Sequence, residues 1–158
     1  MKTSKLPRFC VLARLLFSKT WYPTMLESKV PIRVRYAETD QMGVVYHANY
    51  LAWFESARVQ MLDEVDLPYT QLEAEGYMLP VLECQLKYHS PARFDDRLTI
   101  IARVTEPPKA RLFVTYEVFR DTTLLATGST THTFVNPEGR LIRPHPTFIE
   151  IFTRKIHE

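Results

Sequence analysis

The sequence predicts an α+β domain in which a curved antiparallel five-stranded sheet wraps around one long central helix. One stretch, residues 49–66, places apolar side chains at helical spacing, whereas five other stretches have strand patterns and short connections between them. With 158 residues, of which 46% are hydrophobic and 24% charged, the chain has the size and composition of a single globular domain.

The first strand is expected at residues 30–36. Its apolar side chains, Ile32, Val34 and Tyr36, alternate with two arginines, which is the pattern of a half-buried strand. A polar loop at 38–43 follows it.

The helix is expected at residues 49–66, where apolar side chains recur every three or four positions. These positions are Tyr50, Trp53, Phe54, Ala57, Met61 and Val65. Pro68 and Pro80 then bracket a short connection that has room for another helical turn.

Four further strands fill most of the remaining chain, because these residues alternate or are rich in threonine and other β-branched side chains. Pro107 and Pro108 end one strand, and residues 121–122 form the turn between the last two. The four ranges are 79–88, 98–105, 112–120 and 124–135.

The dimensions of these elements favour a curved sheet. A helix of about 17 residues is roughly 26 Å long and about 10 Å across, whereas a five-stranded sheet is roughly 24 Å wide. A sheet that curls around the helix, as in the hot-dog fold, resolves this mismatch. The strands at 98–105 and 112–120 are apolar or threonine-rich on both faces, so we expect a second copy to cover the outer face in at least a homodimer.

Basic residues dominate only the first 24 positions, where five lysines and arginines occur without any acidic residue. From residue 25 onward, 15 basic side chains face 18 acidic ones. A nucleic-acid-binding domain needs a cationic excess that this part of the chain lacks. Nucleic acid is therefore not an expected partner.

We expect a flexible N-terminal extension at residues 1–27, a folded domain at 28–150 and a C-terminal tail at 151–158. The apolar run at 10–17 contains an arginine and is too short to span a bilayer, so no stable membrane span is expected. The extension also has the composition of a transit peptide, and Met25 is an alternative start of a shorter product.

The cysteines and histidines predict neither a disulfide framework nor a metal site. Cys10 and Cys84 have no CxxC spacing, and His89 and His132 lie on separate predicted strands. We expect a reducing compartment, the cytoplasm, and no metal.

The segment from 36 to 50 carries the candidate chemistry, because it ends where the helix begins. Free N–H groups in the first helical turn favour negative charge and polarise a carbonyl oxygen. Asp40 can take a proton from water or attack an acyl carbon itself, and the sequence does not choose between these routes. His47 can donate a hydrogen bond to the carbonyl or orient the water, Tyr36 can hold Asp40, and Gly43 allows close backbone approach.

Structural roles compete with each of these assignments. Asp40 and Asn49 are also good helix-capping residues, and a histidine at a helix start is usually a hydrogen-bonded structural residue. Glu55 is another candidate base, although we expect it to pair with Arg58 three residues later at the surface or an interface.

The motif residues closely resemble the 4-hydroxybenzoyl-CoA thioesterase family, in particular its branch of small bacterial acyl-CoA thioesterases linked to the Tol-Pal system. The resemblance covers roughly residues 28–150, and the first 24 residues have no counterpart. It rests on Val34-Arg35-Tyr36, Thr39-Asp40, Gly43-Val44-Val45-Tyr46-His47, Asn49-Tyr50, Phe54-Glu55 and Arg58, and more loosely on Tyr88, Pro91-Ala92 and Asp95-Asp96.

This resemblance implies a hot-dog fold, an acyl-CoA substrate, no cofactor, and a homodimer that usually pairs again into a homotetramer. Asp40 corresponds to the family's catalytic aspartate, His47 to the histidine of the Tol-Pal branch, and Tyr36 to a tyrosine beside them. The backbone near Tyr46 and His47 would bind the thioester carbonyl, with Gly43 beside it.

Hydrolysis of an acyl-CoA thioester is thus the expected activity. The alternatives are a hot-dog hydratase or dehydratase and a non-catalytic acyl-binding protein. The acyl chain, delivery by CoA or by acyl-carrier protein, the general-base or covalent route, and dimer or tetramer stay open. Candidate cations for the CoA phosphates are Arg93, Lys109, Arg111 and Arg143, and no spacing singles one out.

Overall fold

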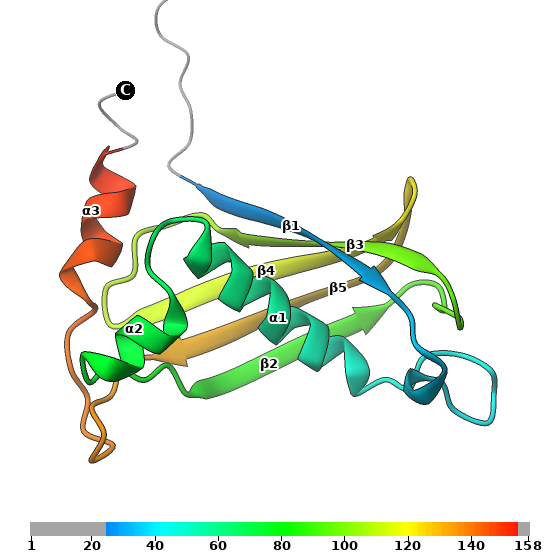
Figure 1. The fold of residues 1–158 in the computed structure, drawn as a ribbon, viewed down its shortest axis with the longest axis horizontal. Coiled ribbons are helices and arrows are strands. Elements are labelled where there is room, and N and C mark those ends of the chain that lie inside the picture. The colour runs from blue at the N-terminus through cyan, green and yellow to red at the C-terminus, as the bar shows by residue number, and fades with distance from the viewer. Residues whose placement is uncertain (1–24, 155–158) are drawn as a thin grey trace, which may run out of the picture.

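The computed structural model describes residues 25–154 (Figure 1). Five strands and three α-helices make up this part of the chain, together with one short 3-10 helix. In chain order these are β1 (Leu26–Arg33), the 3-10 helix η1 (Tyr36–Glu38), α1 (Asn49–Asp63), α2 (Tyr69–Ala74), β2 (Val81–Tyr88), β3 (Arg97–Val104), β4 (Arg111–Arg120), β5 (Thr123–Thr133) and α3 (Pro146–Arg154).

The five strands form one sheet in the order β1-β3-β4-β5-β2, and all neighbouring pairs are antiparallel. Helix α1 lies over one face of this sheet, with β1 and β3 nearest its backbone, and its start lies beside the end of β2 (Figure 1). The predicted α+β hot-dog fold is confirmed.

A single glycine lets α1 pack closely on the sheet. A Cβ atom at Gly128 of β5 would lie 2.5 Å from the Phe54 ring and 2.7 Å from the carbonyl oxygen of Gln85. The Phe54 ring in turn stacks on Tyr116 of β4, with ring centroids 4.2 Å apart and planes 4° apart. The centre of α1 therefore rests on the bare backbone of β5 because residue 128 has no side chain.

The outer face of the sheet is more polar than expected. Arg103 bridges Glu27 of β1 and Glu117 of β4 on this face. Threonine and serine side chains line this face of β5. Phe113 of the neighbouring β4 is an exposed aromatic residue on the same face, with half of its surface accessible. The outer face therefore combines charged, hydroxyl and apolar side chains, and a copy that covers it stays a prediction.

The β2 edge of the sheet is the more open one. Every β2 residue except Leu86 is exposed, including Val81 and Leu82, whereas β1 at the opposite edge alternates buried and exposed side chains and carries Pro31. Proline in an edge strand hinders pairing with another strand. An unprotected edge such as β2 favours addition of a further strand.

The described fold begins before residue 28 and continues past residue 150. Leu26 is buried in β1, and Phe148 and Phe152 of α3 are buried against the core. The C-terminal helix was not expected, although Pro146 at its first position and the spacing of its apolar residues are helix signals. Cys10 and most of the expected N-terminal extension lie outside the described residues.

No helix within residues 25–154 has the length and apolar character needed to cross a membrane.

Candidate active site

The loop that joins β1 to α1 is anchored by Glu38, which is 7% exposed. Its carboxylate accepts hydrogen bonds from the backbone N–H and guanidinium of Arg35, at 2.7 and 3.0 Å, and from Trp53 Nε1 at 3.1 Å. Its carbonyl oxygen accepts from the Tyr46 amide and the Asn49 side chain, both at 2.8 Å. Glu38 thus fixes both ends of the loop to the start of α1.

These contacts also keep Glu38 ionised. Burial alone would raise the pKa of its carboxyl, but the hydrogen bonds from Arg35 and Trp53 outweigh burial and lower the pKa below its ordinary value. Sequence reasoning missed this residue, because its role depends on an indole fifteen positions away.

Asp40 lies in a tight turn within this loop. Its Oδ1 accepts a hydrogen bond from the Met42 amide at 2.8 Å, and its carbonyl accepts from the Gly43 amide at 2.9 Å. Gly43 has φ of 72°, a conformation that L side chains rarely adopt. The turn fixes one carboxylate oxygen, and Oδ2 has no hydrogen-bond partner within residues 25–154.

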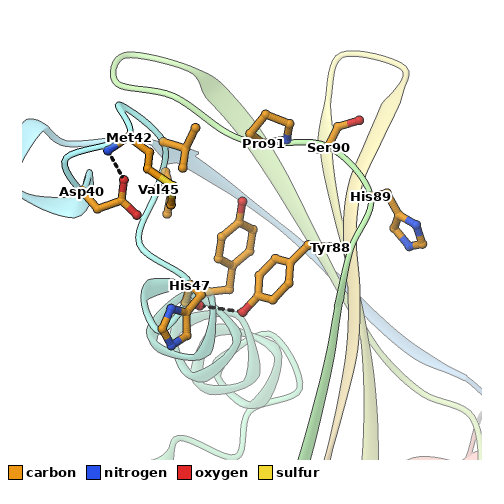
Figure 2. Close-up of a pocket in the computed structure, with 10 residues that line it drawn as sticks. Asp40, Met42, Val45, His47, Tyr88, His89, Ser90 and Pro91 are labelled. Atoms are coloured by element: carbon orange, nitrogen blue, oxygen red, sulfur yellow. Dashed lines mark hydrogen bonds between the residues drawn. The ribbon is translucent and has the colours of Figure 1, made fainter.

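Asp40 and His47 meet at one pocket of about 330 Å³. Figure 2 shows them on the loop side of this pocket, with Tyr88 facing them from the end of β2. The pocket is lined by Asp40, Met42, Val44, Val45, His47, Tyr50, Tyr88, His89, Ser90 and Pro91.

Two backbone amides are free at the start of α1. The Tyr46 amide donates to the Glu38 carbonyl, so it is not available to a ligand. The amides of His47 and Ala48 donate to no acceptor within the described part of the chain. Of the amides expected to polarise a carbonyl, that of Tyr46 is therefore excluded, and those of His47 and Ala48 are available.

His47 is exposed, and Tyr88 holds its backbone. The Tyr88 hydroxyl donates to the His47 carbonyl at 3.0 Å, and the Tyr88 ring packs edge-on against Tyr50 at 5.2 Å. The His47 ring packs against Tyr46 at 4.3 Å, and its nitrogens have no hydrogen-bond partner in residues 25–154. The imidazole can therefore donate to or accept from a ligand.

Tyr36 does not line this pocket. It is 78% exposed and packs edge-on against Phe94 at 5.5 Å, and no hydrogen bond joins its side chain to Asp40 within the described residues. Gly43 supplies the turn rather than the pocket wall, and Tyr46 packs on His47 without lining the pocket. Their roles toward a substrate stay predictions.

Arg93 is the candidate CoA cation that lies beside the Asp40 loop. Its guanidinium donates to the Gly43 carbonyl at 3.4 Å. Lys109 and Arg111 line a separate cavity at the β3–β4 connection, at the opposite end of the sheet from the Asp40 loop (Figure 1).

The expected ion pair between Glu55 and Arg58 is wrong. Glu55 is exposed, whereas Arg58 is buried, and no ion pair joins them among the described residues. The same part of the chain contains no cluster of three or more histidine, cysteine, aspartate or glutamate side chains arranged to hold a metal ion.

Residues 34–152, three quarters of the chain, match the model of the Thioesterase-like superfamily. The chain belongs to this superfamily. Among curated proteins, the chain is similar to the acyl-CoA thioester hydrolase YbgC of Escherichia coli, which is 39% identical over 88 residues, 56% of this chain and 66% of YbgC. YneP of Bacillus subtilis is 41% identical over 73 residues, 46% of this chain.

The matched stretches span 53% of YneP and 66% of YbgC, less than two thirds of either protein. A crystal structure gives a longer match. The DHNA-CoA thioesterase of Staphylococcus aureus has a TM-score of 0.77 and 30% identity, covering 82% of this chain and 91% of that one. All three relatives are named as thioesterases or thioester hydrolases.

Proposed function

We propose that this protein hydrolyses an acyl-CoA thioester to the free acid and CoA. The observation that carries this proposal is one pocket lined both by Asp40, whose carboxylate has a free oxygen, and by His47, whose backbone amide has no partner among the described residues, as is also true of the next amide, that of Ala48. Ester-type hydrolysis needs a base or nucleophile beside donors for the developing oxyanion, and these groups supply both.

In the proposed reaction the thioester carbonyl accepts hydrogen bonds from the His47 and Ala48 amides. Asp40 Oδ2 then removes a proton from a water that attacks the acyl carbon, or itself attacks to give a mixed anhydride that water hydrolyses. In either route the C–S bond breaks, CoA leaves as a thiolate and takes up a proton, and the carboxylate is restored. The exposed His47 imidazole orients the water or donates to the carbonyl.

The Tol-Pal-linked branch of the family is the proposed subgroup, because Asp40 and His47 both occur in it. For the compartment we propose the cytoplasm, since the cysteine pattern suits a reducing environment.

The proposed assembly is a homodimer formed through the exposed β2 edge, which pairs again into a homotetramer. Two-fold symmetry requires that β2 and its copy run antiparallel, and this pairing would satisfy the free backbone groups of the edge. Light scattering coupled to size-exclusion chromatography is expected to give a dimer or larger species, and a monomer at micromolar concentration would contradict this assembly.

Thiol release from a panel of short-chain, long-chain and aromatic acyl-CoAs tests the activity. Wild-type protein is expected to turn over part of the panel, and Asp40→Asn is expected to lower kcat by about 10²- to 10⁴-fold. Asp63→Asn, an exposed residue at the end of α1, is the matched control and should keep wild-type rates. Full activity of a folded Asp40→Asn protein would refute the assignment.

A further inference from the structure

A second cavity lies further along α1, outside the pocket of Asp40 and His47. Its volume is about 410 Å³, which is within the size range of small-molecule sites. It lies between α1, β2 and β5 and is lined by Leu51, Ala52, Glu55, Arg58, Val81, Cys84, Thr130 and His132.

Arg58 is the unusual residue of this cavity. Its side chain is 7% exposed and packs over the Tyr69 ring, with the guanidinium carbon 5.7 Å from the ring centroid. Its Nη1 is fully buried and has no hydrogen-bond partner within the described residues, and no carboxylate there lies within ion-pair distance. A buried charge without a partner is strongly unfavourable, so a cavity that holds one is suited to bind an anion.

The polar neighbours of Arg58 are neutral and already satisfied. His132 faces the Leu79 carbonyl through Nδ1 at 3.1 Å, so this nitrogen carries the proton. Its Nε2 then accepts from the Thr130 hydroxyl at 2.8 Å, and Thr130 accepts from Tyr116 at 3.0 Å. Burial and the nearby Arg58 charge lower the pKa of His132 to about 4. This chain of hydrogen bonds leaves the charge of Arg58 uncompensated.

The cavity and the catalytic pocket occupy one seam between α1 and β2. The helix and the strand run in opposite directions, so the start of α1 lies beside the end of β2 (Figure 1). Tyr50 and Tyr88 line the catalytic pocket, whereas Leu51 and Cys84 line the second cavity. Arg58 follows Ala48 by ten positions, which correspond to about 15 Å of helix.

We propose that the cavity binds the terminal carboxylate of a dicarboxylic acyl chain beside the charged guanidinium of Arg58. The inference rests on the proposed function, because the thioester end of the same chain would lie at Asp40 and the His47 and Ala48 amides. Leu51 and Ala52 are exposed apolar residues between the two positions and would contact the methylene groups. Arg58 is thereby a specificity-determining residue.

Glu55 provides an internal test of the proposal. It is an exposed carboxylate in the lining of the same cavity, where it would repel an anionic ligand. Glu55→Gln removes this repulsion and keeps the shape of the side chain. We therefore expect the Glu55→Gln protein to bind a dicarboxylate several-fold more tightly than wild type. If Glu55 were instead a structural partner of Arg58, the same variant would lower the melting temperature.

Calorimetry with free acids tests the cavity independently of turnover. Wild-type protein is expected to bind sebacate more tightly than decanoate, a monocarboxylate of equal length, by about ten- to a hundredfold, the range for a hydrogen bond to a charged group. Arg58→Met, which removes the charge and keeps much of the apolar stem, should abolish the difference, and Arg58→Lys should retain part of it. Equal binding of both acids by wild type would overturn the proposal.

The ratio of kcat/KM for sebacyl-CoA to that for decanoyl-CoA is the second readout. We expect this ratio to exceed unity in wild type, to fall in Arg58→Met and to rise in Glu55→Gln, while succinyl-CoA, too short to span the seam, gains nothing over butyryl-CoA. A sebacate preference without thiol release from any acyl-CoA would refute the proposed function and leave the anion site standing. Thiol release with a ratio of one would refute the site alone.

Discussion

The two halves of α1 use charged groups in opposite ways. At its start, Glu38 is buried with three donors around its carboxylate, and Asp40 and the free amides are left open to a ligand. Nine residues into the helix, Arg58 is buried without an anionic partner among the described residues. Polar groups with hydrogen-bond partners thus hold the Asp40 loop in place, whereas Arg58, which lacks an anionic partner, marks the second cavity.

Among changes outside the proposed catalytic groups, breaking the anchor of the first site is expected to have the largest effect. In Glu38→Gln, an amide replaces the carboxylate that accepts hydrogen bonds from Arg35 and Trp53. The amide has only one oxygen, so its NH₂ group must face one of these donors and cannot accept from it. We expect kcat to fall about a hundredfold through misplacement of the loop, and unfolding free energy to fall by about 1–3 kcal/mol.

Glu73→Gln, on the exposed surface of α2, is the control for this change. Steady-state kinetics and urea unfolding of both variants give the answer. A Glu38→Gln protein with wild-type kcat would show that the loop keeps its place without this carboxylate.

Gly128→Ala is expected to weaken the packing of the middle of α1 on the sheet. The new methyl group would collide with Phe54 and with the Gln85 carbonyl, so the helix must shift, at a cost of about 1–3 kcal/mol. Thermal unfolding measures this, with Ser129→Ala on the opposite face of β5 as the control. Equal stability of both variants would mean that α1 does not need the bare backbone of β5.

The fold and the meeting of Asp40 and His47 at one pocket were predictable because their signals are local. The alternation in β1 and β3 and the helical spacing of residues 49–63 each lie within one element. Asp40 and His47 are seven positions apart in one loop, so the sequence alone brings them together.

The Arg58 cavity was not predictable in this way. Its wall combines α1 with β2 and β5, and the burial of Arg58 depends on Tyr69 and on the packing of those strands. The surface pairing expected from the spacing of Glu55 and Arg58 is a common pattern on exposed helices. It failed because this face of α1 covers the sheet.

As pH falls, the contribution of His132, which lies beside the second half of α1, to the free energy of unfolding should be lost before that of Glu38, which lies beside the first half. The folded-state pKa of His132 is about 4, below the ordinary 6.5, so its contribution to stability is complete above pH 6.5 and is lost as pH falls through about 4. The lowered pKa of Glu38 makes its contribution fade only below its ordinary value of 4.5.

We expect unfolding free energy to drop by about 1–3 kcal/mol between pH 6.5 and 4.5. His132→Gln should flatten this slope, and His89→Gln, an exposed control, should not. Chemical denaturation at several pH values measures both, and an unchanged slope in His132→Gln would assign the pH dependence to other groups.

Trp53→Phe should produce the smallest effect. It removes one of the donors to Glu38 and keeps the ring in the core, so unfolding free energy should fall by about 0.5–1.5 kcal/mol and kcat by a few-fold. A loss of kcat as large as that of Glu38→Gln would mean that the indole contributes more than this hydrogen bond.

The most direct test of the central claim removes one free amide and nothing else. The Ala48 N–H has no partner within the described residues, so replacing Ala48 by lactate, which turns this N–H into an ester oxygen and keeps the methyl side chain, deletes a donor that the fold itself does not use. We predict that kcat for thiol release falls about 10²- to 10³-fold with the melting temperature nearly unchanged, while Ala48→Gly, which keeps the amide, stays within a few-fold of wild type. A folded ester variant with wild-type kcat would contradict carbonyl polarisation at the start of α1.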